Sequence, residues 1–161
     1  MPIQVGDRLP DATFTTMSAE GPKPMQTAQV FGGKRVALFA VPGAYTPTCS
    51  KQHLPGYVQR FDELKSKGFD TIAFTSVNDI FVLSAWSTAS GADGKILFLA
   101  DGSADFARKV GLEIDLTARG LGVRSKRYSM IVEDGVVKSL NVENAPPEHD
   151  KSSATMMCSL A

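Results

Sequence analysis

The hydrophobic residues of this chain follow two patterns, which alternate along the sequence: continuous apolar runs and apolar residues at helical spacing. The continuous runs are short and rich in β-branched and aromatic side chains, a pattern that predicts buried strands. The last two runs flank Asp134-Gly135, a dipeptide typical of a tight β-hairpin turn. We therefore expect strands at residues 35–41, 69–77, 96–100, 128–132 and 136–142.

The segments between these runs carry helix signals. Thr46-Pro47 opens the first predicted helix, because threonine is favoured at the N-cap and proline at the first helical position. Pro55 lies too far inside to open a helix, so we expect a kink or break there, and Gly68 ends the segment. Further helices are predicted after Asn78-Asp79, with an apolar face of Val82, Leu83 and Trp86, from Ser103 to Val110, and around Cys158 after a polar, proline-rich loop at 144–151.

Strands and helices thus alternate until the closing hairpin. This order predicts an α/β fold, with a central mixed β-sheet flanked by helices and a C-terminal β-hairpin at an antiparallel edge, close to the thioredoxin-like plan. The chain has 161 residues and shows no internal repeat or low-complexity tract. We expect a single domain that spans residues 1–161.

The charge balance narrows the choice of partners. The 17 basic and 17 acidic residues cancel, so the chain lacks the basic surplus of a nucleic-acid-binding protein. Residues 1–7 do not resemble a signal peptide, and no apolar run approaches the roughly 18 residues of a membrane span. We therefore expect a cytoplasmic protein that binds neither nucleic acid nor membranes.

Two cysteines, Cys49 and Cys158, are the candidate reactive groups. Two thiols in a cytosolic chain of this size are not a disulfide framework. Neither belongs to a Cys-x-x-Cys pair, so we expect no zinc site. The sequence also carries no flavin or nucleotide signature, so no cofactor is expected.

Cys49 falls about three residues inside the first predicted helix, directly after a buried strand. Unpaired backbone N–H groups and the positive end of the helix dipole favour a thiolate there. A helix end supplies at most about 2 kcal/mol, whereas nearly complete ionisation of an ordinary thiol at pH 7 requires roughly 3.4 kcal/mol. A second positive group is therefore needed, and Arg127, Arg124 and His53 are the candidates.

The residues around Cys49 form the block Pro42-Gly43-Ala44-Tyr45-Thr46-Pro47-Thr48-Cys49-Ser50, followed by His53-Leu54-Pro55. This block resembles the peroxiredoxin family, and specifically its type II, or five-type, subfamily. Further matches extend the resemblance to about Glu143. They are Val5-Gly6-Asp7, Ser76-Val77-Asn78-Asp79, Leu99-Ala100-Asp101, Lys126-Arg127-Tyr128-Ser129-Met130, Asp134-Gly135 and Leu140-Asn141-Val142-Glu143.

The resemblance implies a thiol peroxidase that reduces hydrogen peroxide and alkyl hydroperoxides. Cys49 would be the peroxidatic cysteine, which attacks the peroxide and becomes a sulfenic acid. Thr46 would hydrogen-bond the thiolate and the peroxide, and Pro42 would shield the sulfur from water. Arg127 would polarise both reactants, while the backbone N–H groups of Gly43 and Cys49 would complete the pocket.

Two other functions compete with a thiol peroxidase. Thr46 replaces the first cysteine of a thioredoxin-type Cys-x-x-Cys motif, so dithiol exchange lacks its local partner. A non-enzymatic redox sensor, which passes the oxidation of Cys49 to a partner protein, shares the first chemical step and remains the alternative. Of the rival positive groups, Arg124 matches no position of the family, and His53 is expected to pack or hydrogen-bond rather than act as a general base.

The role of Cys158 stays open at this point. Cys158-Ser159-Leu160 resembles the tripeptide around the resolving cysteine of animal five-type enzymes, but residues 144–151 depart from that pattern. Residues 152–157 resemble instead the last helix of bacterial relatives without a resolving cysteine. We therefore favour recycling by an external thiol, either glutathione with glutaredoxin or thioredoxin. The resemblance also implies a homodimer whose interface includes Tyr45 and residues 78–86.

Overall fold

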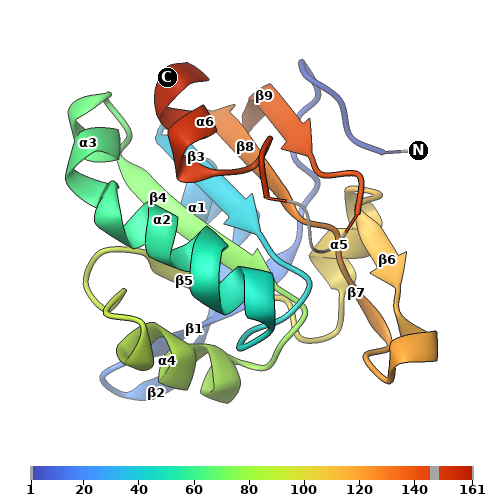
Figure 1. Cartoon of the computed structure of the whole chain (residues 1–161). Coiled ribbons are helices and arrows are strands. Elements are labelled where there is room, and N and C mark those ends of the chain that lie inside the picture. The colour runs from blue at the N-terminus through green and yellow to red at the C-terminus, as the bar shows by residue number, and fades with distance from the viewer. Residues whose placement is uncertain (1, 146–148, 161) are drawn as a thin grey trace.

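The fold is built on a seven-stranded sheet, shown in Figure 1, in a computed structural model that describes residues 2–145 and 149–160. The strands stand in the order β2-β1-β5-β4-β3-β8-β9. The central strands β3, β4 and β5 are parallel, and antiparallel pairs flank them on both sides. The bounds are β1 Thr13–Ser18, β2 Gly21–Gln26, β3 Arg35–Ala40, β4 Thr71–Ser76, β5 Leu97–Ala100, β8 Tyr128–Glu133 and β9 Val136–Val142.

Helices cover both faces of this sheet (Figure 1). Successive side chains of β3 point to opposite faces, so Phe39 joins one apolar cluster and Leu38 the other. A π-helix, α2, α3, α4 and α6 pack on the Phe39 face, and α1 and α5 pack on the Leu38 face. Their bounds are α1 Thr27–Phe31, the π-helix Cys49–His53, α2 Leu54–Gln59, α3 Phe61–Ser66, α4 Ile80–Ala89, α5 Asp105–Lys109 and α6 Ala154–Leu160.

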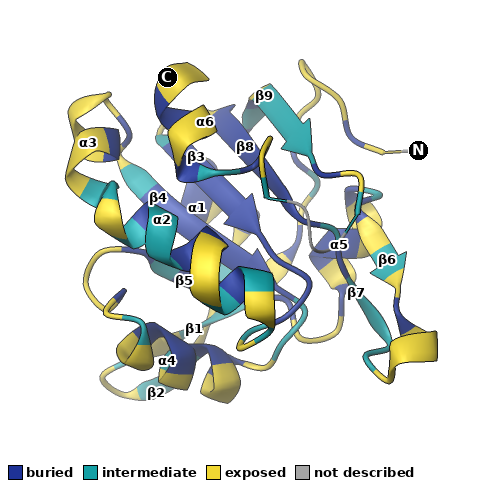
Figure 2. Ribbon diagram, viewed as in Figure 1, coloured by how far each residue is buried: buried dark blue, intermediate teal, exposed yellow. Residues whose placement is uncertain are grey.

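The burial pattern in Figure 2 explains why these sequences form these elements. β3 and β4 are buried nearly throughout because helices lie on both of their faces. The helices bury their inner sides and expose their outer sides to solvent. The five predicted strands and the hairpin turn at Asp134-Gly135 are confirmed, and both turn residues have positive φ.

Two predictions about the helices need correction. Val82 was expected on the apolar face of α4, but it is 36% exposed, and the buried positions of that helix are Ile80, Leu83, Trp86 and Ser87. The helix is also not broken at Pro55. The chain is helical from residue 47 to residue 59, and the π-helix ends at His53, two residues before Pro55. This wider turn gives the proline ring room beside the preceding turn, which a regular α-helix would not.

Several elements outside the predicted pattern extend the fold. β1 and β2 form an N-terminal hairpin, and β2 carries two prolines, which suits an edge strand because its outer N–H groups need no partner. A small second sheet joins β6 (Glu113–Asp115) to β7 (Val123–Ser125), and a short 3₁₀ helix (Thr117–Arg119) connects the two strands.

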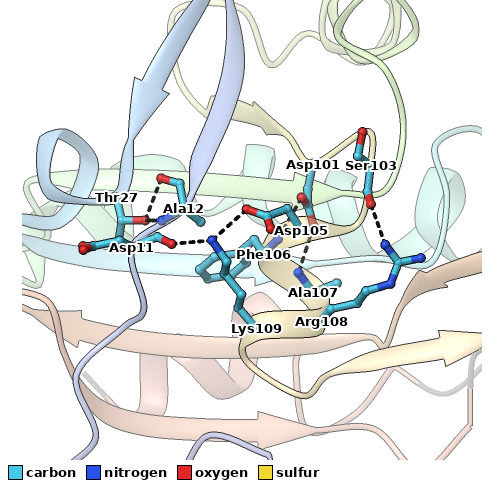
Figure 3. Close-up of polar contacts among 10 residues, drawn as sticks. All are labelled: Asp11, Ala12, Thr27, Asp101, Ser103, Asp105, Phe106, Ala107, Arg108 and Lys109. Atoms are coloured by element: carbon cyan, nitrogen blue, oxygen red, sulfur yellow. Dashed lines mark hydrogen bonds and ion pairs between the residues drawn. The ribbon is translucent and has the colours of Figure 1, made fainter.

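The turn from β5 into α5 is stabilised by a buried carboxylate, Asp101 (Figure 3). Its two oxygens accept hydrogen bonds from the backbone N–H groups of Phe106 and Ala107, at 3.0 and 2.9 Å. Burial raises the pKa of the Asp101 carboxyl above its ordinary value, although these hydrogen bonds act in the opposite direction. Nearby, Lys109 pairs with Asp105 and donates to the Asp11 carbonyl, which ties α5 to the N-terminal segment.

Candidate active site

The site lies where β3 ends and the next helix begins. Pro42 and Gly43 follow the strand and are buried, and Thr46 precedes the first helical residue. The helical bond from the Ser50 N–H to the Thr46 carbonyl, 2.8 Å long, marks the helix start. Cys49 is therefore in the first turn, as predicted, and its side chain is 0% exposed.

Arg127 contacts the sulfur directly. The antiparallel pairing of β3 with β8 places Tyr128 opposite Ala40, so residue 127 lies beside the strand end that leads to the cysteine. The Arg127 side chain is 3% exposed, and its Nη2 donates to Cys49 Sγ over 2.8 Å. The contact is a short hydrogen bond from a planar donor to the sulfur, in a site closed to solvent. Of the three candidate positive groups, the structure puts Arg127 on the sulfur.

His53 acts on Arg127 rather than on the sulfur. Its ring is fully buried, with Nδ1 2.9 Å from Arg127 Nη1 and Nε2 2.9 Å from the Ser152 carbonyl. Because a guanidinium only donates, Nδ1 is the acceptor and Nε2 carries the proton. Burial above all, together with the positive charge of Arg127 and the proximity of His149, holds the pKa of His53 well below its ordinary value. His53 is therefore neutral at pH 7 and cannot be the second positive group.

The C-terminal part of the chain completes this hydrogen-bonded series. Ser152 accepts at its carbonyl from His53 and from the Tyr57 hydroxyl, each over 2.9 Å. Its own N–H and hydroxyl donate to Glu143 Oε2 over 2.7 and 2.6 Å. Partial burial would raise the pKa of Glu143, but the bonds from Ser152 lower it, so the carboxylate is ionised. These contacts form one hydrogen-bonded series, which runs from the Cys49 sulfur through Arg127, His53 and Ser152 to Glu143.

Thr46 differs from its predicted role. Its hydroxyl donates to the Gly43 carbonyl over 2.7 Å, so its proton is committed and its oxygen is left as an acceptor. It therefore neither caps the helix through its side chain nor donates to the thiolate in this conformation. Arg124 lies close by, and donates to the Leu121 and Pro42 carbonyls over 2.7 and 3.4 Å. Arg124 thus supports the loop, while Arg127 contacts the sulfur.

The loop before the helix holds a strained conformation. Tyr45 has a φ of 64°, a region that non-glycine residues seldom adopt, and its side chain is 55% exposed. The Ala44 N–H donates to Asn78 Oδ1 over 3.0 Å, and the Tyr45 ring stands 6.0 Å from that of Trp86. The start of α4 therefore holds this loop in place.

Cys158 lies elsewhere in the same apolar cluster. Along α6, Ala154 contacts the position of Gly56, and the Cys158 thiol is within hydrogen-bonding reach of Arg60 and Glu63. Arg60 follows Cys49 by eleven residues in a helical stretch, which corresponds to roughly 16 Å at 1.5 Å per residue. A disulfide requires Cα atoms within about 7 Å. The predicted site residues thus come together except Cys158, which would need a rearrangement to reach Cys49.

Two residues of the hydrogen-bonded series, Ser152 and Glu143, were not predicted as site residues. Glu143 had one visible signal, because it directly follows the outer hairpin strand, where a carboxylate faces the neighbouring strand end. Ser152 had no such signal, because it contacts His53 through its backbone carbonyl, a group that every residue type carries. Within residues 2–145 and 149–160, no group of three or more His, Cys, Asp or Glu side chains could hold a metal ion. In the same ranges, no helix is long and apolar enough to cross a bilayer.

Comparison with known proteins gives a consistent picture. The redoxin family profile matches residues 4–157. Peroxiredoxin-2E, chloroplastic, from Arabidopsis thaliana is 45% identical over 98% of this chain and 69% of that protein. Reduced Prx3 from Vibrio vulnificus in complex with hydrogen peroxide superposes with a TM-score of 0.93, at 49% identity, over 98% of each chain. Peroxiredoxin 5 from Alvinella pompejana gives a TM-score of 0.83 at 32% identity, over 98% of this chain and 96% of that one. This chain therefore belongs to the peroxiredoxin family, in its type II subfamily, and is a thiol-dependent peroxidase.

Proposed function

We propose that Cys49 is the peroxidatic residue of this enzyme. Its thiolate attacks the nearer oxygen of a hydroperoxide, so an S–O bond forms while the O–O bond breaks. The sulfur loses two electrons and becomes a sulfenic acid, and the leaving oxygen takes a proton to give water or an alcohol. The observation that carries this proposal is the 2.8 Å contact of a buried guanidinium with a buried thiol at a helix start.

Arg127 serves both reactants in this proposal. Its Nη2 stabilises the attacking thiolate, and the same cationic group lies at the place where negative charge grows on the leaving oxygen. His53 holds Nη1 and so fixes the plane of the guanidinium. His53 is therefore a positioning residue, and the bonds through Ser152 to Glu143 hold the imidazole in turn.

Thr46 and Pro42 complete the reaction pocket in the proposal. The Thr46 hydroxyl donates its hydrogen to the Gly43 carbonyl. Its oxygen therefore accepts a hydrogen bond from the peroxide O–H, which orients the peroxide toward the sulfur. Pro42 has no N–H and lines the inner end of the pocket, where it keeps water from the thiolate. The N–H groups of Gly43 and Cys49 remain the proposed donors to the oxygen.

An external thiol completes the cycle. The position of Cys158 beside Arg60, a residue about three helical turns after Cys49, supports a one-cysteine cycle over an internal disulfide. Burial above all, and the nearby Glu63 carboxylate, raise the pKa of the Cys158 thiol and keep it protonated. We propose glutathione with glutaredoxin, or thioredoxin, as reductant, and hydrogen peroxide and alkyl hydroperoxides as substrates.

We further propose a homodimer that forms through the surface around Tyr45. Phe81 is 66% exposed and Val82 36% exposed on the outer side of α4, and the exposed Tyr45 ring stands 6.0 Å from the ring of Trp86 in the same helix. Aromatic and aliphatic side chains gathered in this way are typical of protein interfaces. Sedimentation equilibrium would test the dimer, with Phe81→Glu expected to give monomers. We also propose a cytoplasmic location, which fractionation of the source cells would test.

The experiment for the enzymatic cycle is steady-state peroxide consumption with each reductant in turn. We expect many turnovers, and intact-mass analysis after stoichiometric peroxide should show one added oxygen, located on Cys49. A redox sensor would instead stop after a single equivalent in the presence of every reductant. A Cys49–Cys158 disulfide at high yield would replace the one-cysteine cycle by a two-cysteine one.

A further inference from the structure

A pocket of about 240 Å³ opens at the entrance to the Cys49 site. Pro42, Thr46 and Arg127 line its inner end, and Arg127 contacts the buried sulfur, so the pocket offers a hydroperoxide a route toward Cys49. Its volume far exceeds what hydrogen peroxide needs, since a water molecule occupies about 30 Å³ in the liquid. The pocket therefore has room for the organic part of a larger hydroperoxide.

One wall of the pocket is apolar and held by the backbone. Leu116 and Leu121 form this wall together with Pro42 and Pro47. The Leu116 N–H donates to the Gly122 carbonyl over 2.7 Å, and the Leu121 N–H donates to the Leu116 carbonyl over 3.2 Å. The loop between the strands of the small sheet is thus closed on itself, and it presents a fixed hydrocarbon surface.

Arg119 places a positive charge at the outer rim of this apolar wall. It ends the short 3₁₀ helix of the same loop, its side chain is exposed, and it lines the pocket. In the described part of the chain, no carboxylate pairs with Arg119, and none of the described lining residues is acidic. Arg127, in contrast, is occupied at the inner end by the sulfur and His53. The pocket thus has a reactive inner end, an apolar wall and a cationic rim.

We propose that Arg119 determines specificity and makes this enzyme prefer hydroperoxides that carry a carboxylate. The matching ligand class is the hydroperoxide of a fatty acid, whose hydrocarbon chain packs on the wall while the carboxylate pairs with the guanidinium. This inference rests on the proposed role of Cys49 and adds a substrate class to it. The ion pair between the substrate carboxylate and Arg119 lies at the surface. We therefore expect a carboxylate to raise the rate of reaction by a factor of about 3 to 10.

The test compares two substrates that differ only in charge, linoleic acid hydroperoxide and its methyl ester. Pre-reduced protein is mixed with each at concentrations below micelle formation, and loss of hydroperoxide is followed through a single turnover without reductant. The wild type should react about 3 to 10 times faster with the acid. Arg119→Gln should abolish this ratio, and Arg119→Lys should keep most of it. Lys95→Gln, which removes an equal charge from an exposed position after α4, should leave the ratio unchanged.

The outcomes separate this inference from the enzyme's basic chemistry. Failure of the wild type to oxidise Cys49 with hydrogen peroxide would contradict the proposed role of Cys49. Reaction with hydrogen peroxide together with an acid-to-ester ratio near one would leave that role intact and overturn the role of Arg119. Persistence of the ratio in Arg119→Gln would do the same. Loss of the ratio in high salt, where surface pairs are screened, would support it.

Discussion

Two of the turns that lead from a parallel strand into a helix, those after β5 and β3, lie at the same edge of the sheet and differ in which side chain occupies the helix start. After β5, the Asp101 carboxylate occupies the N–H groups of Phe106 and Ala107 (Figure 3). After β3, the Thr46 hydroxyl donates to the Gly43 carbonyl and so does not cap the helix. The Cys49 sulfur, which contacts Arg127, lies in the first turn of this helix. The turn after β5 is closed by the fixed carboxylate of Asp101 and stabilises the fold. The turn after β3 leaves the helix start to the reactive side chain of Cys49.

Exchange of the reactive atom should produce the largest effect on this comparison. Cys49→Ser keeps the size of the side chain but removes the nucleophile, so we expect peroxidase turnover to fall roughly 10³-fold or more with an unchanged unfolding midpoint. Cys158→Ser is the matched control and should keep turnover within about twofold. Peroxide consumption and thermal unfolding of both variants give the result, and substantial activity in Cys49→Ser would sink the assignment.

Removal of the cation from the β3 turn should give the next largest effect. Arg127→Gln loses the charge on the sulfur and on the leaving oxygen, so the second-order rate constant with peroxide should fall about 10²- to 10³-fold. Arg124→Gln, which removes an equal charge beside Pro42, should lose less than about tenfold. Stopped-flow measurement of the oxidation step compares the two, and the reverse ranking would contradict the assignment of Arg127.

The β5 turn should respond in stability rather than in rate. Asp101→Ala leaves two N–H groups at the start of α5 without their acceptor, and should lower the free energy of unfolding by about 2 kcal/mol. Asp101→Asn retains one acceptor oxygen and should lose less. Urea unfolding measures both values. A large loss of peroxide reactivity in folded Asp101→Asn would blur the distinction between the two turns.

Acid should lower the free energy of unfolding through the two histidines on the β3 side of the molecule. Burial lowers the pKa of both histidines, His53 and His149, in the folded protein. As the pH falls, each histidine is therefore protonated at a higher pH in the unfolded chain than in the folded one. Their contribution to stability is present above about pH 6.5 and is lost as the pH falls, with a slope of at most about 1.4 kcal/mol per pH unit for each histidine. Urea titrations between pH 7.5 and 5.5 would show this, and His149→Gln should reduce the slope. A flat profile would contradict it.

The sequence was sufficient for those parts of the molecule whose signal is local. The buried strands, the hairpin at Asp134-Gly135 and the place of Cys49 at a helix start follow from runs, turn residues and caps. The contact of Arg127 with the sulfur was available only through the family resemblance, because nothing local shows that residue 127 faces residue 49. The β1–β2 hairpin was missed because its polar, proline-containing edge strand lacks an apolar rhythm.

The hydrogen-bonded series could not be predicted in the same way. His53 carries no visible sign that its ring is held by a backbone carbonyl 99 residues away. The direction of the Thr46 hydroxyl likewise depends on the path of the Gly43 carbonyl, which only the folded loop defines. Groups that position the reactive side chain are therefore chosen by tertiary packing, and their residue types alone do not reveal them.

The distribution of the site along the chain has a consequence for the order in which the protein is made. Cys49 is synthesised 78 residues before Arg127, and His53 is synthesised 99 residues before Ser152. A nascent chain therefore carries its thiol through the synthesis of these 78 residues without the guanidinium that contacts it in the folded protein. The contacts that surround Cys49 therefore depend on residues that are synthesised long after the cysteine itself.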